Sequence, residues 1–226
     1  MVKQLLISDF DGVILDSEYS YSLLSVEFLK TCGINMTLPE YLSRYSGMAH
    51  SELYKAIKEH YNQDISVYHN RYLDFMLSYK DHLSLIPNVH KYFNSWSGAK
   101  CIASSSVKST IIDILQINDL SSIFPDEYIF SAADCQNYKP FPDVYIKARE
   151  TMGFDAQDCI AVEDSAVGVR SAVDAGIDVI GFVGGKHIID YNLGDKHGQA
   201  LKDLGAVHIA HSMDELASYL TKIQQQ

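Results

Sequence analysis

Pairs of carboxylates stand directly after two apolar segments of the 226-residue chain. Asp9 and Asp11 follow the run 4–8, and Glu163 and Asp164 follow a second run later in the chain. In an open parallel sheet, ligands bind beyond the carboxyl ends of the strands, so these side chains should meet in one cleft. Four carboxylates in one cleft repel one another strongly unless positive charge is present. The pattern therefore predicts a site for a hard divalent cation.

Oxygen-only ligands favour Mg²⁺, which typically binds one or two carboxylates and leaves a position for a phosphate oxygen. Asp9, Asp164 and Glu163 are the side chains expected to hold this ion. With the ion present, the carboxylate of Asp9 is able to attack phosphorus and form an aspartyl phosphate. Asp11, two residues further on, would protonate the leaving oxygen and then activate water. This chemistry is the hydrolysis of a phosphate ester.

Hydroxyl, amide and ammonium groups are expected to hold the phosphoryl oxygens, over which the charge of the transition state is spread. Ser104 and Ser105 follow the predicted strand 100–103, and Lys139 lies in a later loop. Gly12 would let the backbone approach the phosphate because glycine has no side chain. We therefore expect these four residues to bind the phosphoryl group.

Each of these residues also has a plainer interpretation. Asp9 and Asp11 are common turn residues, Ser104 could be an ordinary helix cap, and Lys139 could lie in solvent. Glu163 and Asp164 could be the acidic first turn of a helix. The appearance of all of them in order, each after a predicted strand or in a loop beside one, favours the catalytic interpretation.

The predicted elements explain how these residues would be positioned. After Pro87 strand and helix patterns alternate, which is typical of a parallel sheet covered by helices on both faces. Residues 16–85 show helical spacing instead, with Thr37 to Glu40 as a capping box after a stop at Gly33. The prediction is an α/β doubly wound parallel sheet, residues 1–15 and 86–226, with a small inserted α-helical cap domain, residues 16–85. The strands are expected at residues 4–8, 100–103, 128–130, 159–162, 178–183 and 206–209.

Composition narrows the possible partners and the compartment. The 18 Lys and Arg against 29 Asp and Glu give a formal net charge of −11, which disfavours nucleic acid and anionic membranes. The four cysteines form no CxxC pair, and no apolar run is long enough to span a bilayer. Four histidines near the carboxyl end, including His197, lack zinc spacing and are expected to be solvated. We expect a cytoplasmic protein that acts on a small molecule without an obligate protein partner.

Four motifs together resemble those of the haloacid dehalogenase-like hydrolases, and specifically their β-phosphoglucomutase-like branch with a helical cap. They are Asp9-Phe10-Asp11-Gly12-Val13, Ser104, Tyr138-Lys139-Pro140, and Glu163 to Gly168. The resemblance implies a Rossmann-like core and an aspartyl-phosphate mechanism. It also implies Mg²⁺ held by Asp9, the backbone carbonyl of Asp11, and Asp164.

The resemblance also bears on the substrate. Asp11 disfavours dehalogenation, and Tyr21 and His50 stand where the mutases of the branch have a histidine and an arginine. The segment from Tyr45 to His50 resembles the specificity loop of the cap, so Tyr21, Tyr45 and His50 are expected to contact the substrate. We expect a phosphatase that acts on a sugar or sugar-acid phosphate, a class of enzymes that includes the 6-phosphogluconate-type phosphatases. The alternatives are a sugar phosphomutase and a non-catalytic metabolite-binding module.

Overall fold

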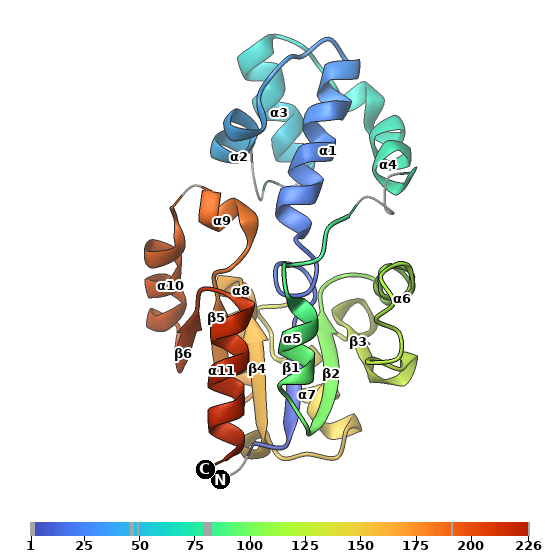
Figure 1. Cartoon of the computed structure of the whole chain (residues 1–226). Coiled ribbons are helices and arrows are strands. Elements are labelled where there is room, and N and C mark those ends of the chain that lie inside the picture. Colours follow the sequence, from blue (N-terminus) through green and yellow to red (C-terminus); the bar gives the residue numbers. More distant parts are fainter. Residues whose placement is uncertain (1–2, 46–47, 49, 79–82, 191, 226) are drawn as a thin grey trace. The chain divides into compact units, whose positions relative to one another are not determined.

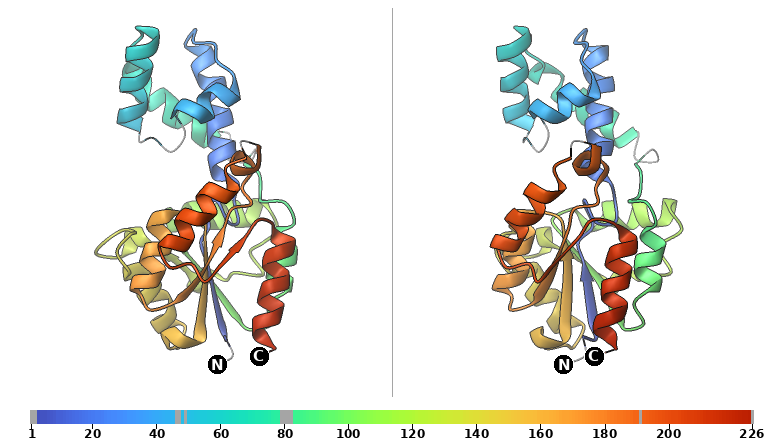
Figure 2. Two further views of the ribbon diagram at one scale, coloured as in Figure 1. Left: turned by 90° about the vertical axis from the view of Figure 1, so that its left-hand side faces the viewer. Right: turned by 60° about the vertical axis from the view of Figure 1, so that its left-hand side comes forward.

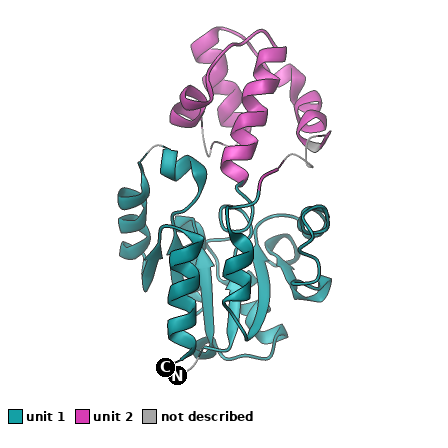
Figure 3. Cartoon of the chain, in the orientation of Figure 1, with its two compact units in different colours: residues 1–16, 85–226 teal, residues 17–84 magenta. Residues whose placement is uncertain are grey.

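The computed structural model describes residues 3–45, 48, 50–78, 83–190 and 192–225. The chain divides into two compact units. Unit 1 comprises Met1–Asp16 and Leu85–Gln226, and unit 2 comprises Ser17–Ser84 (Figure 3). Unit 2 therefore interrupts unit 1 in the sequence shortly after its first strand.

Unit 1 is built on a six-stranded sheet with the order β3-β2-β1-β4-β5-β6, and every neighbouring pair is parallel. The predicted doubly wound parallel sheet is confirmed, and the predicted strand ends differ from the observed ones by at most two residues. All four residues of the central strand β1 are buried, as expected where helices cover both faces. The strands are β1 Leu5–Ser8, β2 Ala99–Ser104, β3 Ile129–Ser131, β4 Cys159–Glu163, β5 Asp178–Phe182 and β6 His208–Ala210.

Helices cover both faces of this sheet (Figures 1 and 2). Helices α5 (Val89–Asn94) and α11 (Met213–Gln224) pack against each other on one face. On the other face, α7 (Asp143–Thr151) contacts β1, β2 and β3, and α8 (Ala166–Asp174) contacts β4 and β5. The remaining helices are α6 Lys108–Ile117, α9 Lys186–Asp190 and α10 Gly194–Asp203, with short 3₁₀ turns at Asp126–Tyr128, Ala132–Asp134 and Ala156–Asp158.

The register of the sheet sets the position of the residues beyond the strands. Ser8 pairs with Ile102 on one side and with Val162 on the other. The backbone N–H of Asp9 still donates to the carbonyl of Val162, at 2.9 Å. Asp9 therefore emerges beside Glu163, at the carboxyl edge of the two central strands.

Unit 2 is a helical bundle with its own core, in which Leu29, Tyr41, Leu53 and Ile57 are buried. One of the two hydrogen bonds of the predicted capping box is confirmed: the hydroxyl of Thr37 accepts the backbone N–H of Glu40 at 3.3 Å. The helices are α1 Ser17–Thr31, α2 Leu38–Tyr45, α3 His50–Tyr61 and α4 His69–Ser78, with a 3₁₀ turn at Ser66–Tyr68.

Candidate active site

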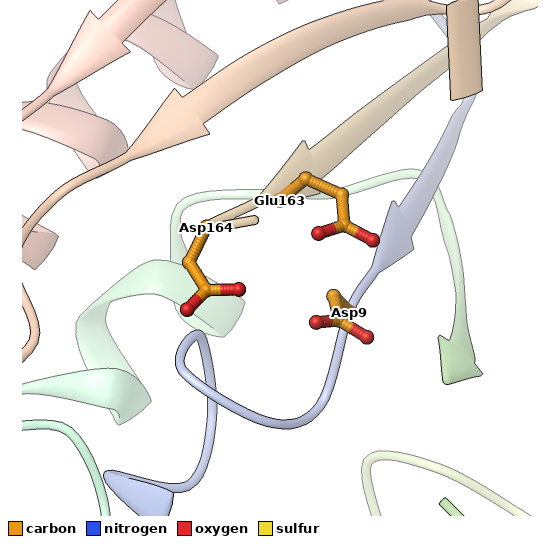
Figure 4. Close-up of side chains that lie close together, drawn as sticks. All are labelled: Asp9, Glu163 and Asp164. Carbon is orange, nitrogen blue, oxygen red and sulfur yellow. The ribbon is translucent and has the colours of Figure 1, made fainter. Parts of the chain in front are cut away.

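Three predicted carboxylates converge beyond the ends of β1 and β4 (Figure 4). Asp9 follows β1, Glu163 is the last residue of β4, and Asp164 follows it. Each offers one oxygen such that all three oxygens lie within 4.8 Å of one another. Glu163 is fully buried and Asp9 is 5% exposed. Asp164 is half-buried, so the parallel strand ends concentrate negative charge in a pocket that is closed around Glu163 and Asp9 and open to water at Asp164.

Lys139 places a positive charge in the middle of this cluster. Its side chain is 3% exposed, and its ammonium donates to Oδ1 of Asp9 at 2.8 Å and to Oε1 of Glu163 at 2.6 Å. A third bond reaches the carbonyl of Ala103 at 3.0 Å. An ammonium has three donors, so these three acceptors saturate it. Lys139 therefore orients Asp9 while it offsets part of the charge.

The carboxylate of Glu163 is held from all sides by protein donors. Lys139 and the hydroxyl of Tyr145, the latter at 2.7 Å, bond to Oε1. The hydroxyl and backbone N–H of Ser165 bond to Oε2, at 3.1 and 3.4 Å. A Cβ on Gly168 would collide with the same carboxylate. Glu163 is thus fixed as the anchor of Lys139.

Burial dominates the electrostatics of the two aspartates. Burial and the charge of Glu163 raise the pKa of Asp9 to about 8, although Lys139 acts in the opposite direction. Burial and the charge of Asp9 raise the pKa of Asp164 well above its usual range. Burial alone would lower the pKa of Lys139, but the carboxylates of Asp9 and Glu163 outweigh it and keep the ammonium charged. A single ammonium does not compensate the negative charge of the cluster.

These features fit a divalent cation. Asp9 and Asp164 offer hard oxygen ligands, and their raised pKa values show that more positive charge at this point would be stabilising. Lys139 binds Oδ1 of Asp9, so the second oxygen of that carboxylate is the one to face an ion. An acidic cluster with the donor chemistry of a divalent-cation site is therefore present.

Asp11 is held by hydroxyl groups from the last residue of β2 and from the loop after it. The hydroxyl of Ser106 donates to Oδ2 of Asp11 at 2.6 Å, and that of Ser104 lies at 3.4 Å from the same oxygen. Ser104 also accepts the backbone N–H of Ser106 at 2.9 Å, which shapes the loop. The side chain of Ser105, by contrast, is exposed. Ser106 was not among the predicted site residues, although it belongs to the same serine run.

Gly12 lies against Asp164. Its φ is +76°, and a Cβ there would collide with the carboxylate of Asp164. On the other side of Asp164, its carbonyl accepts the Nε2–H of His197, at 2.6 Å, from helix α10. His197, which was expected to be solvated, is half-buried and takes part in this contact, because the topology brings α10 to the end of β4, which no local spacing reveals. Gly12 and His197 together fix where Asp164 stands.

The three predicted cap residues come together within unit 2. Tyr21, Tyr45 and His50 all line one cavity of that unit. Tyr45 is buried, Tyr21 is half-buried and His50 is exposed. Residues 46, 47 and 49 of the predicted specificity loop lie outside the described residues.

Comparisons with known proteins agree with this geometry. The family model of the haloacid dehalogenase-like hydrolases matches residues 6–182. The 6-phosphogluconate phosphatase of Escherichia coli is 24% identical, over 79% of this chain and 82% of that protein. The phosphoglycolate phosphatase of Aquifex aeolicus is 23% identical, over 76% and 81%. A haloacid dehalogenase-like protein of Agrobacterium tumefaciens has the same fold, with a TM-score of 0.81 at 24% identity over 98% and 99% of the two chains.

No helix in the described part of the chain combines the length and the apolar character that crossing a membrane requires.

The family match and the phosphatases among the relatives confirm the predicted class of enzyme, a phosphoric monoester hydrolase. The family match covers both carboxylate pairs, the serine run and Lys139. The chain belongs to the haloacid dehalogenase-like hydrolases.

Proposed function

We propose that the protein is a Mg²⁺-dependent phosphatase of a small phosphorylated metabolite, a sugar or sugar-acid phosphate, and that Asp9 is its nucleophile. The observation that carries this proposal is the arrangement around Asp9. One of its oxygens is fixed by Lys139 at 2.8 Å, and Asp164 stands beside it within the 4.8 Å cluster. A carboxylate held on one oxygen presents the other in a defined direction, as in-line attack on phosphorus requires.

Asp9 and Asp164 are the side chains that we assign to the metal, together with the backbone carbonyl of Asp11. We assign Glu163 to Lys139 rather than to the metal, because four protein donors already bind its carboxylate. Bound Mg²⁺ would supply the positive charge that lets an anionic nucleophile approach an anionic ester.

The first half of the reaction forms a bond between Asp9 and phosphorus and breaks the ester bond. Asp11 gives its proton to the departing alcohol oxygen, and the hydroxyl of Ser106 holds Oδ2 of Asp11. The negative charge of Asp9 passes to the departing oxygen and, once that oxygen is protonated, stays on Asp11 as a carboxylate. Lys139 would exchange one of its present acceptors for a phosphoryl oxygen, and Ser104 and the backbone N–H of Ser105 are the further donors that we assign.

The second half returns the enzyme to its starting state. Asp11, now a carboxylate, takes a proton from water as the water oxygen attacks phosphorus. The bond between Asp9 and phosphorus breaks, and inorganic phosphate leaves. Each half uses the same two aspartates, with Asp11 acting first as an acid and then as a base.

Phosphate release from a panel of sugar, sugar-acid, nucleotide and glycolate phosphates tests this proposal. We expect release that depends on Mg²⁺, that is lost in Asp9→Asn, and that persists in Asp134→Asn, which removes an exposed carboxylate. Isomerised sugar phosphate in place of free phosphate would identify a mutase. Binding of esters without any turnover would identify a metabolite-binding module, and either result would overturn the proposal.

A further inference from the structure

Ser131 is a fully buried serine at the end of β3, and it is not one of the residues that we assign to the reaction. The register of the sheet places it opposite Ser104, the last residue of β2. Both residues therefore lie at the carboxyl edge of the sheet, on the side of the catalytic cluster. Burying a hydroxyl group costs free energy unless it is hydrogen-bonded, so the bonds of Ser131 indicate what the group does.

The hydroxyl of Ser131 makes one local bond and one bond to another segment. It accepts the backbone N–H of Ala133 at 3.1 Å, which caps the 3₁₀ turn Ala132–Asp134. It donates its only proton to the backbone carbonyl of Ser106, at 2.7 Å. A serine that accepts an N–H two residues further on is a common turn feature. The donated bond is not part of this turn, because Ser106 precedes Ser131 by 25 residues in the sequence.

Ser106 is held through both of its backbone polar groups. Its N–H donates to the hydroxyl of Ser104 at 2.9 Å, and its carbonyl accepts the proton of Ser131. The two serine side chains belong to the ends of the neighbouring strands β2 and β3. The hydroxyl of Ser106 is directed to Oδ2 of Asp11, at 2.6 Å. We call Ser104, Ser106 and Ser131 the serine clamp.

The serine clamp fixes a stretch of loop that exposed side chains do not fix. Ser105 and Val107, on either side of Ser106, are exposed, Val107 to 56%. The position of Asp11 matters because an acid must stand within hydrogen-bond reach of the oxygen that it protonates. A displacement of about 1 Å at a reacting group lowers a rate by up to about 100-fold. Loosening the carbonyl of Ser106 should therefore affect Asp11, although the bond that is lost joins two other residues.

We propose that Ser131 is a positioning residue for the proton transfer by Asp11, and that it acts through the carbonyl and the hydroxyl of Ser106. Because Ser106 donates to Oδ2, Oδ1 of Asp11 is the oxygen that we assign to carry the proton toward the leaving group. The inference rests on the proposed phosphatase activity and adds to it a residue of β3. The serine clamp sets where the acid and base of the reaction stands.

Esters that differ in their need for an acid test this role. An alkoxide takes up a proton as it leaves, whereas p-nitrophenolate leaves as a stable anion, so acid catalysis serves only the alkoxide. We compare kcat/KM, which covers the steps up to phosphoryl transfer to Asp9, for glucose 6-phosphate, 6-phosphogluconate and p-nitrophenyl phosphate at saturating Mg²⁺. Ser131→Ala should lower kcat/KM by at least about tenfold for the two sugar esters and by less than about twofold for p-nitrophenyl phosphate.

Ser171→Ala is the matched control. Ser171 is also fully buried and also donates to the carbonyl of another segment, that of Phe141, at 2.6 Å. Its replacement removes a bond of the same kind, yet the ratio of kcat/KM between the sugar esters and p-nitrophenyl phosphate should stay at the wild-type value. If Ser131→Ala does not fold, Ser131→Cys, which has a weaker donor of similar size, takes its place in the same comparison.

A double-mutant cycle shows whether Ser131 acts through Ser106. Ser106→Ala should show the same selective loss for the sugar esters, and adding Ser131→Ala to it should cause no further loss. Equal losses for all three esters, losses that multiply in the double variant, or an equal change of the ratio in Ser171→Ala overturn the inference and leave the phosphatase intact. If the wild type hydrolyses no sugar ester, the proposed phosphatase fails, and the inference fails with it.

Discussion

Replacing Gly12 by alanine should have two effects, one on the stability of the fold and one on metal binding. The backbone there has φ +76°, which costs a residue with a side chain about 1–2 kcal/mol. The new Cβ also collides with the carboxylate of Asp164, so this side chain must move. We expect a loss of unfolding free energy of about 1–2 kcal/mol from the strain, and a further loss of metal affinity from the displaced ligand.

Gly153→Ala is the matched control, because Gly153 lies in the same unit with φ +80° and a Cβ added to it would meet no atom within 4 Å. In urea unfolding, this variant should lose the same amount of unfolding free energy, about 1–2 kcal/mol, and it should bind Mg²⁺ as the wild type does. Gly12→Ala should bind Mg²⁺ at least about tenfold more weakly in calorimetry, since a ligand is misplaced. If both variants bind Mg²⁺ with wild-type affinity, Asp164 is not the ligand that we assign.

Three further substitutions or conditions probe the same cluster. The pKa of Asp9 in the folded protein is raised to about 8, so the free energy of unfolding of the metal-free protein should fall as pH rises from about 4 to 8. In urea unfolding, adding Mg²⁺ or replacing Asp9 by Asn should make this fall less steep. If neither change alters the pH dependence, the charge argument is contradicted. Tyr145→Phe removes a buried hydrogen bond to Glu163 and should cost about 1.5–3 kcal/mol in unfolding free energy and lower kcat, whereas Tyr138→Phe, 53% exposed, should change neither. His197→Ala should weaken Mg²⁺ binding by about tenfold through the released carbonyl of Asp164, and an unchanged Mg²⁺ titration would rule out this positioning role.

The catalytic cluster could be predicted from the sequence because its members sit where strands end. Asp9, Glu163 and Asp164 follow short apolar runs directly, and parallel strands bring such residues to one edge. Local signals also predicted the start of α2, where Thr37 accepts the N–H of Glu40. In both cases the structural consequence lies within a few residues of the signal.

The residues that hold the cluster in place had no such signal. Tyr145 reaches Glu163 from the first turn of α7, and His197, which lies 33 residues after Asp164 in the sequence, reaches the carbonyl of Asp164 from α10. A lone tyrosine or histidine in a helix is compatible with core packing or with solvent, so only the packing of α7 and α10 on the sheet assigns them. The role of Glu163 was likewise hidden, since its four donors come from three separate segments.

The central claim is that the oxygen of Asp9 bonds to phosphorus during turnover. Intact-protein and peptide mass spectrometry after acid quench tests it most directly, in Asp11→Asn supplied with Mg²⁺ and a hydrolysable ester, because loss of the base should slow the second half of the reaction. The account predicts one phosphoryl group on the peptide that contains Asp9, and none when Asp9 is also replaced by Asn. A phosphoryl group on another residue, or phosphate release by the Asp9→Asn protein at the wild-type rate, would contradict it.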